Sequence, residues 1–258
     1  MTPAVAEAAY LYCLVRMAAQ PRMGGVPEGL PGAGRPLAVQ AAPSTWLILS
    51  EVPLSKYGPK PLEDTLRDLE RVAELAVAHE SVVEYFARTS AATVVPMKMF
   101  SMFSSVERAV AEMRDRRNEI DLVLDRVAGC EEWGVRITAR APRVVRSTPE
   151  RPRSGTAFLA ARKRARDQAR NAVQKATHAA ALAFEELSAL AREARQRKEV
   201  PPGATAPMLD AAFLIPARSR AKFRAAAKRL SRTCAAAGAE LTLTGPWPAY
   251  NFVEKPDD

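Results

Sequence analysis

The chain has 258 residues, of which 48% are hydrophobic and 26% are charged, and its formal net charge is +9. This balance excludes a wholly disordered chain, and the length leaves room for two domains of roughly 120 residues each. No stretch approaches the ~20 uninterrupted apolar residues of a membrane span, and the first seven residues lack the basic start and apolar middle of a secretory signal, so we expect a cytoplasmic protein.

The first part of the chain is predicted to contribute four strands. Residues 8–15 are rich in strand formers and are followed by a Gly/Pro-rich loop. Residues 37–40 and 45–52 can pair as the next two strands across a turn that contains a proline. A short strand at 93–96 ends at a proline.

Two amphipathic helices are predicted in the same part. Apolar residues recur at helical spacing over residues 61–90, and a single break is expected near His79. A second helix should run toward residue 127. Ser104 or Ser105 can cap it, and an acidic residue three positions after Ser104 favours a capping box at that serine.

The second part is predicted to alternate strands with helices. Residues 142–155 contain three prolines and several arginines and are expected to form a linker. Residues 156–199 lack glycine and proline and are rich in helix formers, which favours one very long helix or two stacked helices. The remaining elements are strands at 133–138, 209–215 and 240–244 and a helix at 219–237 that Gly238 closes.

Strands that alternate with long helices, without βα units of uniform length, indicate an α+β fold class. We expect two domains, each a small sheet covered by helices. The N-terminal α+β domain is predicted to comprise residues 1–130. The C-terminal α+β domain is predicted to comprise residues 131–258, with the long helix and an aromatic and proline-rich C-terminal tail.

Much of the excess positive charge lies between Arg143 and Arg170. A basic field of this kind attracts polyanions without sequence specificity, so a nucleic-acid or anionic-surface binding protein is the alternative function. A solvated linker followed by a charged helix face explains the same residues. Charge alone therefore does not predict a specific nucleic-acid partner.

Motifs that carry catalysis or cofactor binding are absent from the sequence. It has no phosphate-binding glycine loop at the start of a helix, no paired metal ligands and no nucleophile motif. His79 and His178 lie in separate helical segments, and Cys13, Cys130 and Cys234 are far apart, which favours reduced thiols over disulfides. We therefore predict a non-enzymatic protein without catalytic residues, cofactor or metal.

Two segments are unusual for an ordinary core. Residues 97–103 concentrate soft, adaptable side chains of the kind found both in irregular cores and at apolar binding surfaces. Residues 245–253 combine two prolines with three aromatic rings, which must either pack on their own domain or anchor a partner. The candidate partner-binding residues are Met97, Lys98, Met99, Phe100, Met102, Phe103, Trp247, Tyr250 and Phe252.

The C-terminal segment also carries a resemblance to a known family. Residues 243–252, LTGPWPAYNF, resemble the LTGPWPPYxF ending of the GvpL/GvpF family of gas vesicle proteins. Further similar segments occur in the family's order at residues 10–15, 49–53, 78–83, 94–100, 132–136 and 212–215. The chain departs from the common PLRFGT segment at Lys98 and Phe100, which replace an arginine and a glycine, and Ala249 replaces a common proline.

The resemblance implies a cytoplasmic accessory protein associated with gas vesicles. It implies two α+β domains, of which the first resembles a modified ferredoxin-like fold. It further implies that the chain binds the small hydrophobic shell protein GvpA, together with other gas vesicle accessory proteins, and that it supports vesicle nucleation or growth. A soluble protein with an apolar groove or a free sheet edge could hold such a shell protein before assembly.

Overall fold

The computed structural model describes residues 6–89, 92–140, 155–197 and 206–253. The chain divides into two compact units. The first unit comprises Met1–Glu131 together with Trp247–Asp258, and the second comprises Glu132–Pro246. The sequence analysis placed the aromatic tail in the C-terminal domain, whereas the structure packs it with the first unit, because the rings of Tyr250 and Phe252 bury themselves there.

The first unit contains a five-stranded sheet in the order β2-β3-β1-β4, with β5 also paired to β1. Each printed pairing in this sheet is antiparallel. The three opening strands and the fourth strand lie where the sequence predicted them, whereas the short β5 was not predicted. The strands are β1 (Glu7–Arg16), β2 (Leu37–Ala42), β3 (Thr45–Pro53), β4 (Thr93–Pro96) and β5 (Met102–Phe103).

The helices of this unit are shorter than the sequence predicted. They are α1 (Leu54–Tyr57), α2 (Pro59–Thr65), α3 (Leu69–Ala87), α4 (Val106–Asp115) and α5 (Arg117–Val127), with a 3-10 turn η2 (Tyr250–Phe252). The break expected near His79 occurs earlier, because the Asp68 side chain accepts from the backbone N–H groups of Glu70 and Arg71 and starts a new helix. Ser105, not Ser104, caps α4 by accepting from Arg108 N.

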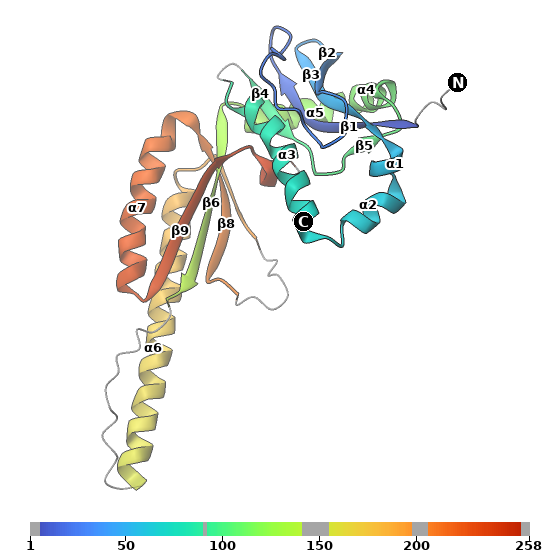
Figure 1. Cartoon of the computed structure of the whole chain (residues 1–258). Helices are drawn as coiled ribbons and strands as arrows, with labels where there is room; N and C mark the ends of the chain where they lie inside the picture. Colours follow the sequence, from blue (N-terminus) through green and yellow to red (C-terminus); the bar gives the residue numbers. More distant parts are fainter. Residues whose placement is uncertain (1–5, 90–91, 141–154, 198–205, 254–258) are drawn as a thin grey trace. The chain divides into compact units, whose positions relative to one another are not determined.

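Strand β1 is buried on both faces, since all but its two terminal residues are buried. One face packs on α3 through Tyr10 and Tyr12, which share a core cluster with Val82, Val83 and Phe86. Helix α4 packs on β1, β2 and β3, and α5 packs on β4. The helices therefore cover both faces of this sheet (Figure 1), as hydrophobic residues on both sides of a strand require.

The second unit contains a four-stranded sheet in the order β7-β8-β6-β9. Two long helices, α6 and α7, lie side by side on one face of it (Figure 1). Phe213 and Phe223 meet in the core between the sheet and the helices, with ring centroids 5.5 Å apart. The elements are β6 (Cys130–Ala139), α6 (Gly155–Ser188), β7 (Glu193–Gln196), β8 (Leu209–Pro216), the 3-10 turn η1 (Ala217–Ser219), α7 (Arg220–Ala236) and β9 (Ala239–Trp247).

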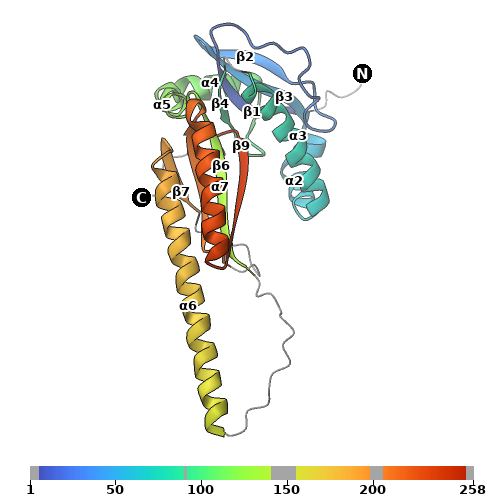
Figure 2. The same ribbon diagram turned by 90° about the vertical axis from the view of Figure 1, so that its left-hand side faces the viewer.

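Helix α6 extends well beyond the sheet that it covers (Figure 2). Only its C-terminal half is buried, through Ala176, Ala179, Ala180, Ala183 and Leu187. Every described side chain over residues 156–175 is exposed. The basic residues predicted to form a charged helix face lie on this exposed part, while the linker predicted over residues 142–155 lies outside the described residues except for Gly155.

Two elements of the second unit differ from the sequence prediction. The long helix was expected to reach residue 199, but it ends at Ser188, because Glu193–Gln196 pairs with β8 as the strand β7. Tertiary pairing here overrides helix propensity. The last strand was expected to end at residue 244, but β9 continues through Gly245 and Pro246, which an edge strand tolerates because one side needs no ladder bond.

The mixed α+β class predicted from the sequence is confirmed, with two small sheets flanked by helices. Cys13, Cys130 and Cys234 form no disulfide among the described residues, and Cys13 and Cys234 are buried.

Candidate functional site

A groove of about 620 Å³ lies in the first unit between α3, the connection from β4 to β5, and η2. Lys98 and Met99 of the connection and Tyr250 of the aromatic tail line it. The two segments singled out in the sequence therefore meet at one site, although 150 residues separate them. Helix α3 supplies the rest of the lining: Ala76, Val77, His79, Glu80, Ser81 and Glu84.

The connection from β4 to β5 is fixed to strand β1 at both ends. Met97 N donates to Tyr12 O at 2.9 Å, and Leu11 N donates to Ser101 O at 2.9 Å. Within the connection, Ser101 Oγ donates to Lys98 O at 2.7 Å. These hydrogen bonds hold Lys98 at the groove as part of an ordered loop rather than a free tether.

Phe100 adopts a left-handed backbone conformation with φ of 64°. Its N–H donates to Tyr10 Oη at 3.3 Å, and its ring packs against the core below. A residue with a Cβ is strained in this region, by about 1–2 kcal/mol. The strained residue directly follows Met99, which lines the groove.

The strain at Phe100 predicts an inverted preference between glycine and alanine. Phe100→Gly and Phe100→Ala both lose the ring, but the glycine variant should be more stable by about 1 kcal/mol because glycine adopts a positive φ freely. Denaturant unfolding of the two variants measures this difference. The control pair is Met102→Gly and Met102→Ala, because Met102 has no positive φ. There the alanine variant should be the more stable by about 0.5–1 kcal/mol. If alanine were the more stable variant at Phe100 as well, the backbone strain at Phe100 would be contradicted.

His79 is buried beneath the groove with 2% of its surface exposed. Its Nδ1 lies 2.7 Å from Tyr10 Oη. Which of these two atoms donates depends on the tautomer of the ring, because Tyr10 Oη, which already accepts from Phe100 N, has a second lone pair. Burial lowers the pKa of His79 to about 4, an effect that the nearby Met97 backbone only partly offsets, so the ring is neutral at physiological pH.

Glu80 forms the second polar pair of the groove. Tyr250 Oη donates to Glu80 Oε2 and links the tail to α3. Burial raises the pKa of the Glu80 carboxyl, while this hydrogen bond lowers it, and Glu84 adds a smaller increase. Burial, reinforced by the Glu80 carboxylate, also raises the pKa of Tyr250, so its hydroxyl remains a donor.

Two buried polar atoms at the groove have no hydrogen-bond partner among the described residues. They are His79 Nε2 and Glu80 Oε1. His79 Nε2 donates or accepts according to the tautomer of the ring, and the Glu80 oxygen is a carboxyl oxygen that can accept. Unsatisfied buried polar groups cost roughly 1–3 kcal/mol each, and because neither atom is open to solvent, a chain lying in the groove would not reach them without a local rearrangement.

The structure brings only some of the predicted binding residues together. Lys98, Met99 and Tyr250 line the groove. Phe252 is fully buried, whereas Trp247 keeps 45% of its surface exposed. Met97, Phe100, Met102 and Phe103 are half-buried and lie beside the groove in sequence without lining it.

The sequence analysis missed the helical side of the groove. His79 was interpreted as an ordinary helix residue, and Val77, Glu80, Ser81 and Glu84 were not selected. Their spacing of three and four residues places them on one stripe of α3, and Val77 is 67% exposed there. The sequence signal that could have identified His79, Glu80 and Ser81 is the segment at residues 78–83, which resembles the GvpL/GvpF family.

Among the described residues, no group of three or more His, Cys, Asp or Glu side chains is placed to hold a metal ion. In the same part of the chain, no helix is both long and apolar enough to cross a membrane. The groove therefore offers polar and apolar contacts rather than a metal site.

The sequence matches the profile of the family described as "Gas vesicle synthesis protein GvpL/GvpF" over residues 8–254. A curated relative, gas vesicle protein L of Streptomyces sp. (strain CB03234), is 27% identical over 259 residues. That match covers 94% of this chain and 91% of the relative.

Two crystal structures share the fold. Gas vesicle protein GvpF from Anabaena sp. PCC7120 aligns with a TM-score of 0.67 at 17% identity and covers 97% of this chain and 98% of its own. GvpF from Microcystis aeruginosa aligns with a TM-score of 0.64 at 12% identity and covers 96% and 99% of the two chains. The similarity extends over both units.

Proposed function

Because this chain belongs to the GvpL/GvpF family of gas vesicle synthesis proteins, we propose that it is a non-enzymatic assembly factor that binds the hydrophobic shell protein GvpA. A gas vesicle role follows from the family; the partner and the mechanism are our proposal. Binding would take place in the cytoplasm at growing vesicles, together with other accessory proteins, and would support vesicle nucleation or growth.

The observation that carries the proposal is the groove that joins the β4–β5 connection to the aromatic tail. Its lining combines exposed Val77 and half-buried Met99 with two unpaired buried polar atoms. A thioether adapts to apolar partners of different shape. An apolar segment of a partner would cover this surface and remove it from water.

The groove also limits the alternative of catalysis. Perturbed pKa values in a cleft are a common mark of catalytic groups. Here the His79 ring is hydrogen-bonded to Tyr10. Glu80 accepts a hydrogen bond from Tyr250, which anchors the tail. These contacts support a role in shaping the groove rather than in proton transfer to a substrate.

The test is co-purification of the tagged full-length chain with GvpA at low and high salt. We expect capture that resists salt, since apolar contacts are not screened. Val77→Glu should reduce capture about tenfold, because a charge in the centre of an apolar contact is costly. The matched control is Leu122→Glu on α5, because Leu122 has the same exposed fraction of 67% outside the groove.

An unrelated hydrophobic peptide serves as the specificity control. Failure to capture GvpA, or equal losses from the two glutamate variants, would reject the groove as its binding site. Capture that disappears in high salt would favour the charge-driven alternative, in which the basic face of α6 binds an anionic surface.

A further inference from the structure

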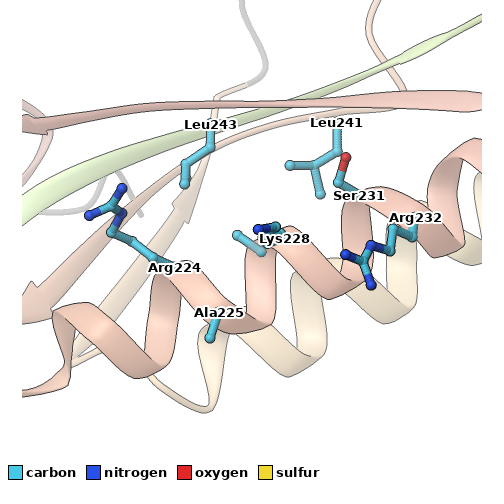
Figure 3. A pocket seen from close by; sticks show the side chains of 8 residues that line it. Arg224, Ala225, Lys228, Ser231, Arg232, Leu241 and Leu243 are labelled. Atoms are coloured by element: carbon cyan, nitrogen blue, oxygen red, sulfur yellow. The ribbon is translucent and has the colours of Figure 1, made fainter.

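A second groove, of about 540 Å³, lies in the second unit between α7 and β9 (Figure 3). Leu241 and Leu243 project from β9 toward the helix and form its apolar side (Figure 3). Leu241 is almost fully buried and Leu243 is half-buried. The groove therefore lies at the surface, beside the edge of the hydrophobic core of the second unit.

The opposite side of this groove is basic. Arg224, Lys228 and Arg232 recur every four residues along α7 and line the groove together as one stripe. No acidic residue lines the groove. Within the described part of the chain none of the three cations forms an ion pair, whereas Arg229 on the neighbouring face of the helix pairs with Glu186. The stripe thus presents uncompensated positive charge beside apolar surface.

Among the described strands the groove borders an unpaired sheet edge, because β9 is the last strand in the order β7-β8-β6-β9. Arg140 N donates to Gly238 O at 2.9 Å, which directs the backbone of even-numbered residues toward β6. By alternation, the N–H and C=O groups of Leu241 and Leu243 point away from β6. Pro246 has no N–H, so the edge available for pairing ends before it.

We propose that β9 and this groove bind an extended acidic segment of a partner protein, which adds to the sheet as a strand. The backbone of the segment would pair with Leu241 and Leu243. Its alternate side chains would face the groove, with apolar groups against these leucines and carboxylates against Arg224, Lys228 and Arg232. Backbone pairing supplies affinity in this mode of recognition, and alternate side chains supply specificity.

Charge complementarity favours an acidic protein segment over a second copy of this chain, whose net charge is also +9. The two leucines and the strand edge favour a peptide over a polynucleotide, since phosphate groups would make no use of either feature. This site is separate from the groove of the first unit and does not depend on the identity of its partner.

The experiment uses the full chain and a fluorescein-labelled ten-residue peptide whose alternate positions carry valine and glutamate in turn, with threonine at the positions between, so that one face of the strand presents both side chains. Anisotropy titration should detect binding, and Arg224→Glu combined with Lys228→Glu should weaken it about tenfold. The matched control combines Arg218→Glu with Lys222→Glu, which changes the net charge equally at exposed positions that do not line the groove. That control should change the affinity less than about twofold.

Hydrogen exchange distinguishes strand addition from simple charge attraction. The amides of Leu241 and Leu243 should exchange more slowly when the peptide is bound, and a peptide with a central proline should bind more weakly. Unchanged exchange at β9, equal weakening by the two double variants, or tighter binding of a labelled single-stranded oligonucleotide than of the acidic peptide would overturn the proposal.

Discussion

Replacing Phe252 with alanine is expected to lower the free energy of unfolding of the first unit by about 3–5 kcal/mol. The ring has no exposed surface, although it belongs to the last described turn of the chain. Removing it leaves a cavity that the surrounding α5 and η2 cannot close completely. Denaturant unfolding monitored by circular dichroism measures the change.

Trp247→Ala is the comparison within the same tail. A fully buried ring at this position would cost on the order of 3 kcal/mol. Because 45% of Trp247 is exposed, we expect a smaller cost than for Phe252, about 2 kcal/mol. An equal cost for Trp247 and Phe252 would mean that both rings serve the core, and would remove Trp247 as a candidate contact for GvpA.

Acidification is expected to destabilise the first unit through His79. The pKa of the buried ring is about 4 in the folded chain, compared with an ordinary value of 6.5. Between pH 6.5 and pH 4 the His79 ring is protonated in the unfolded chain but stays neutral in the folded chain. The stabilisation that is present above pH 6.5 is therefore lost as the pH falls. The loss reaches about 3 kcal/mol near pH 4.

Glu80 acts in the opposite direction over an overlapping window. Burial raises the pKa of its carboxyl, so the folded state gains stability as the pH falls through the interval above the ordinary value of a glutamate. The contribution of His79 is therefore measured as a difference. Between pH 7 and pH 4 the stability of the wild type should fall by about 3 kcal/mol relative to His79→Gln.

The control is His178→Gln, at an exposed position of α6. The His79 comparison should be repeated in a Glu80→Gln background, which removes the neighbouring carboxylate. A constant difference between wild type and His79→Gln across this pH range would show that the ring is not held neutral by burial.

Much of the fold could be predicted because its elements carry local signals. The β2–β3 hairpin, the apolar periodicity of α3 and the glycine at the end of α7 are each specified by residues within one element. The errors occurred where distant contacts decide the outcome. Strand β7 has little strand propensity of its own and exists because β8 provides its hydrogen-bond partners.

The groove of the first unit was only half predictable for a related reason. The unusual composition of its two non-helical segments is visible in the sequence, and both were selected. The hydrogen bond between Tyr250 and Glu80 spans 170 residues, and no periodicity reports such a contact. Nor does local sequence distinguish exposed Trp247 from buried Phe252, because irregular backbone has no fixed period that assigns side chains to a face.

The exposed half of α6 carries the second unit beyond its own sheet. Residues 156–175 add about 30 Å at 1.5 Å per residue, and no described side chain over this stretch is buried. A bend of only about 10° where the helix leaves its sheet would displace the tip by about 5 Å. A molecule held at that tip would be tethered at a distance, whereas a molecule held against β9 would be aligned with the sheet.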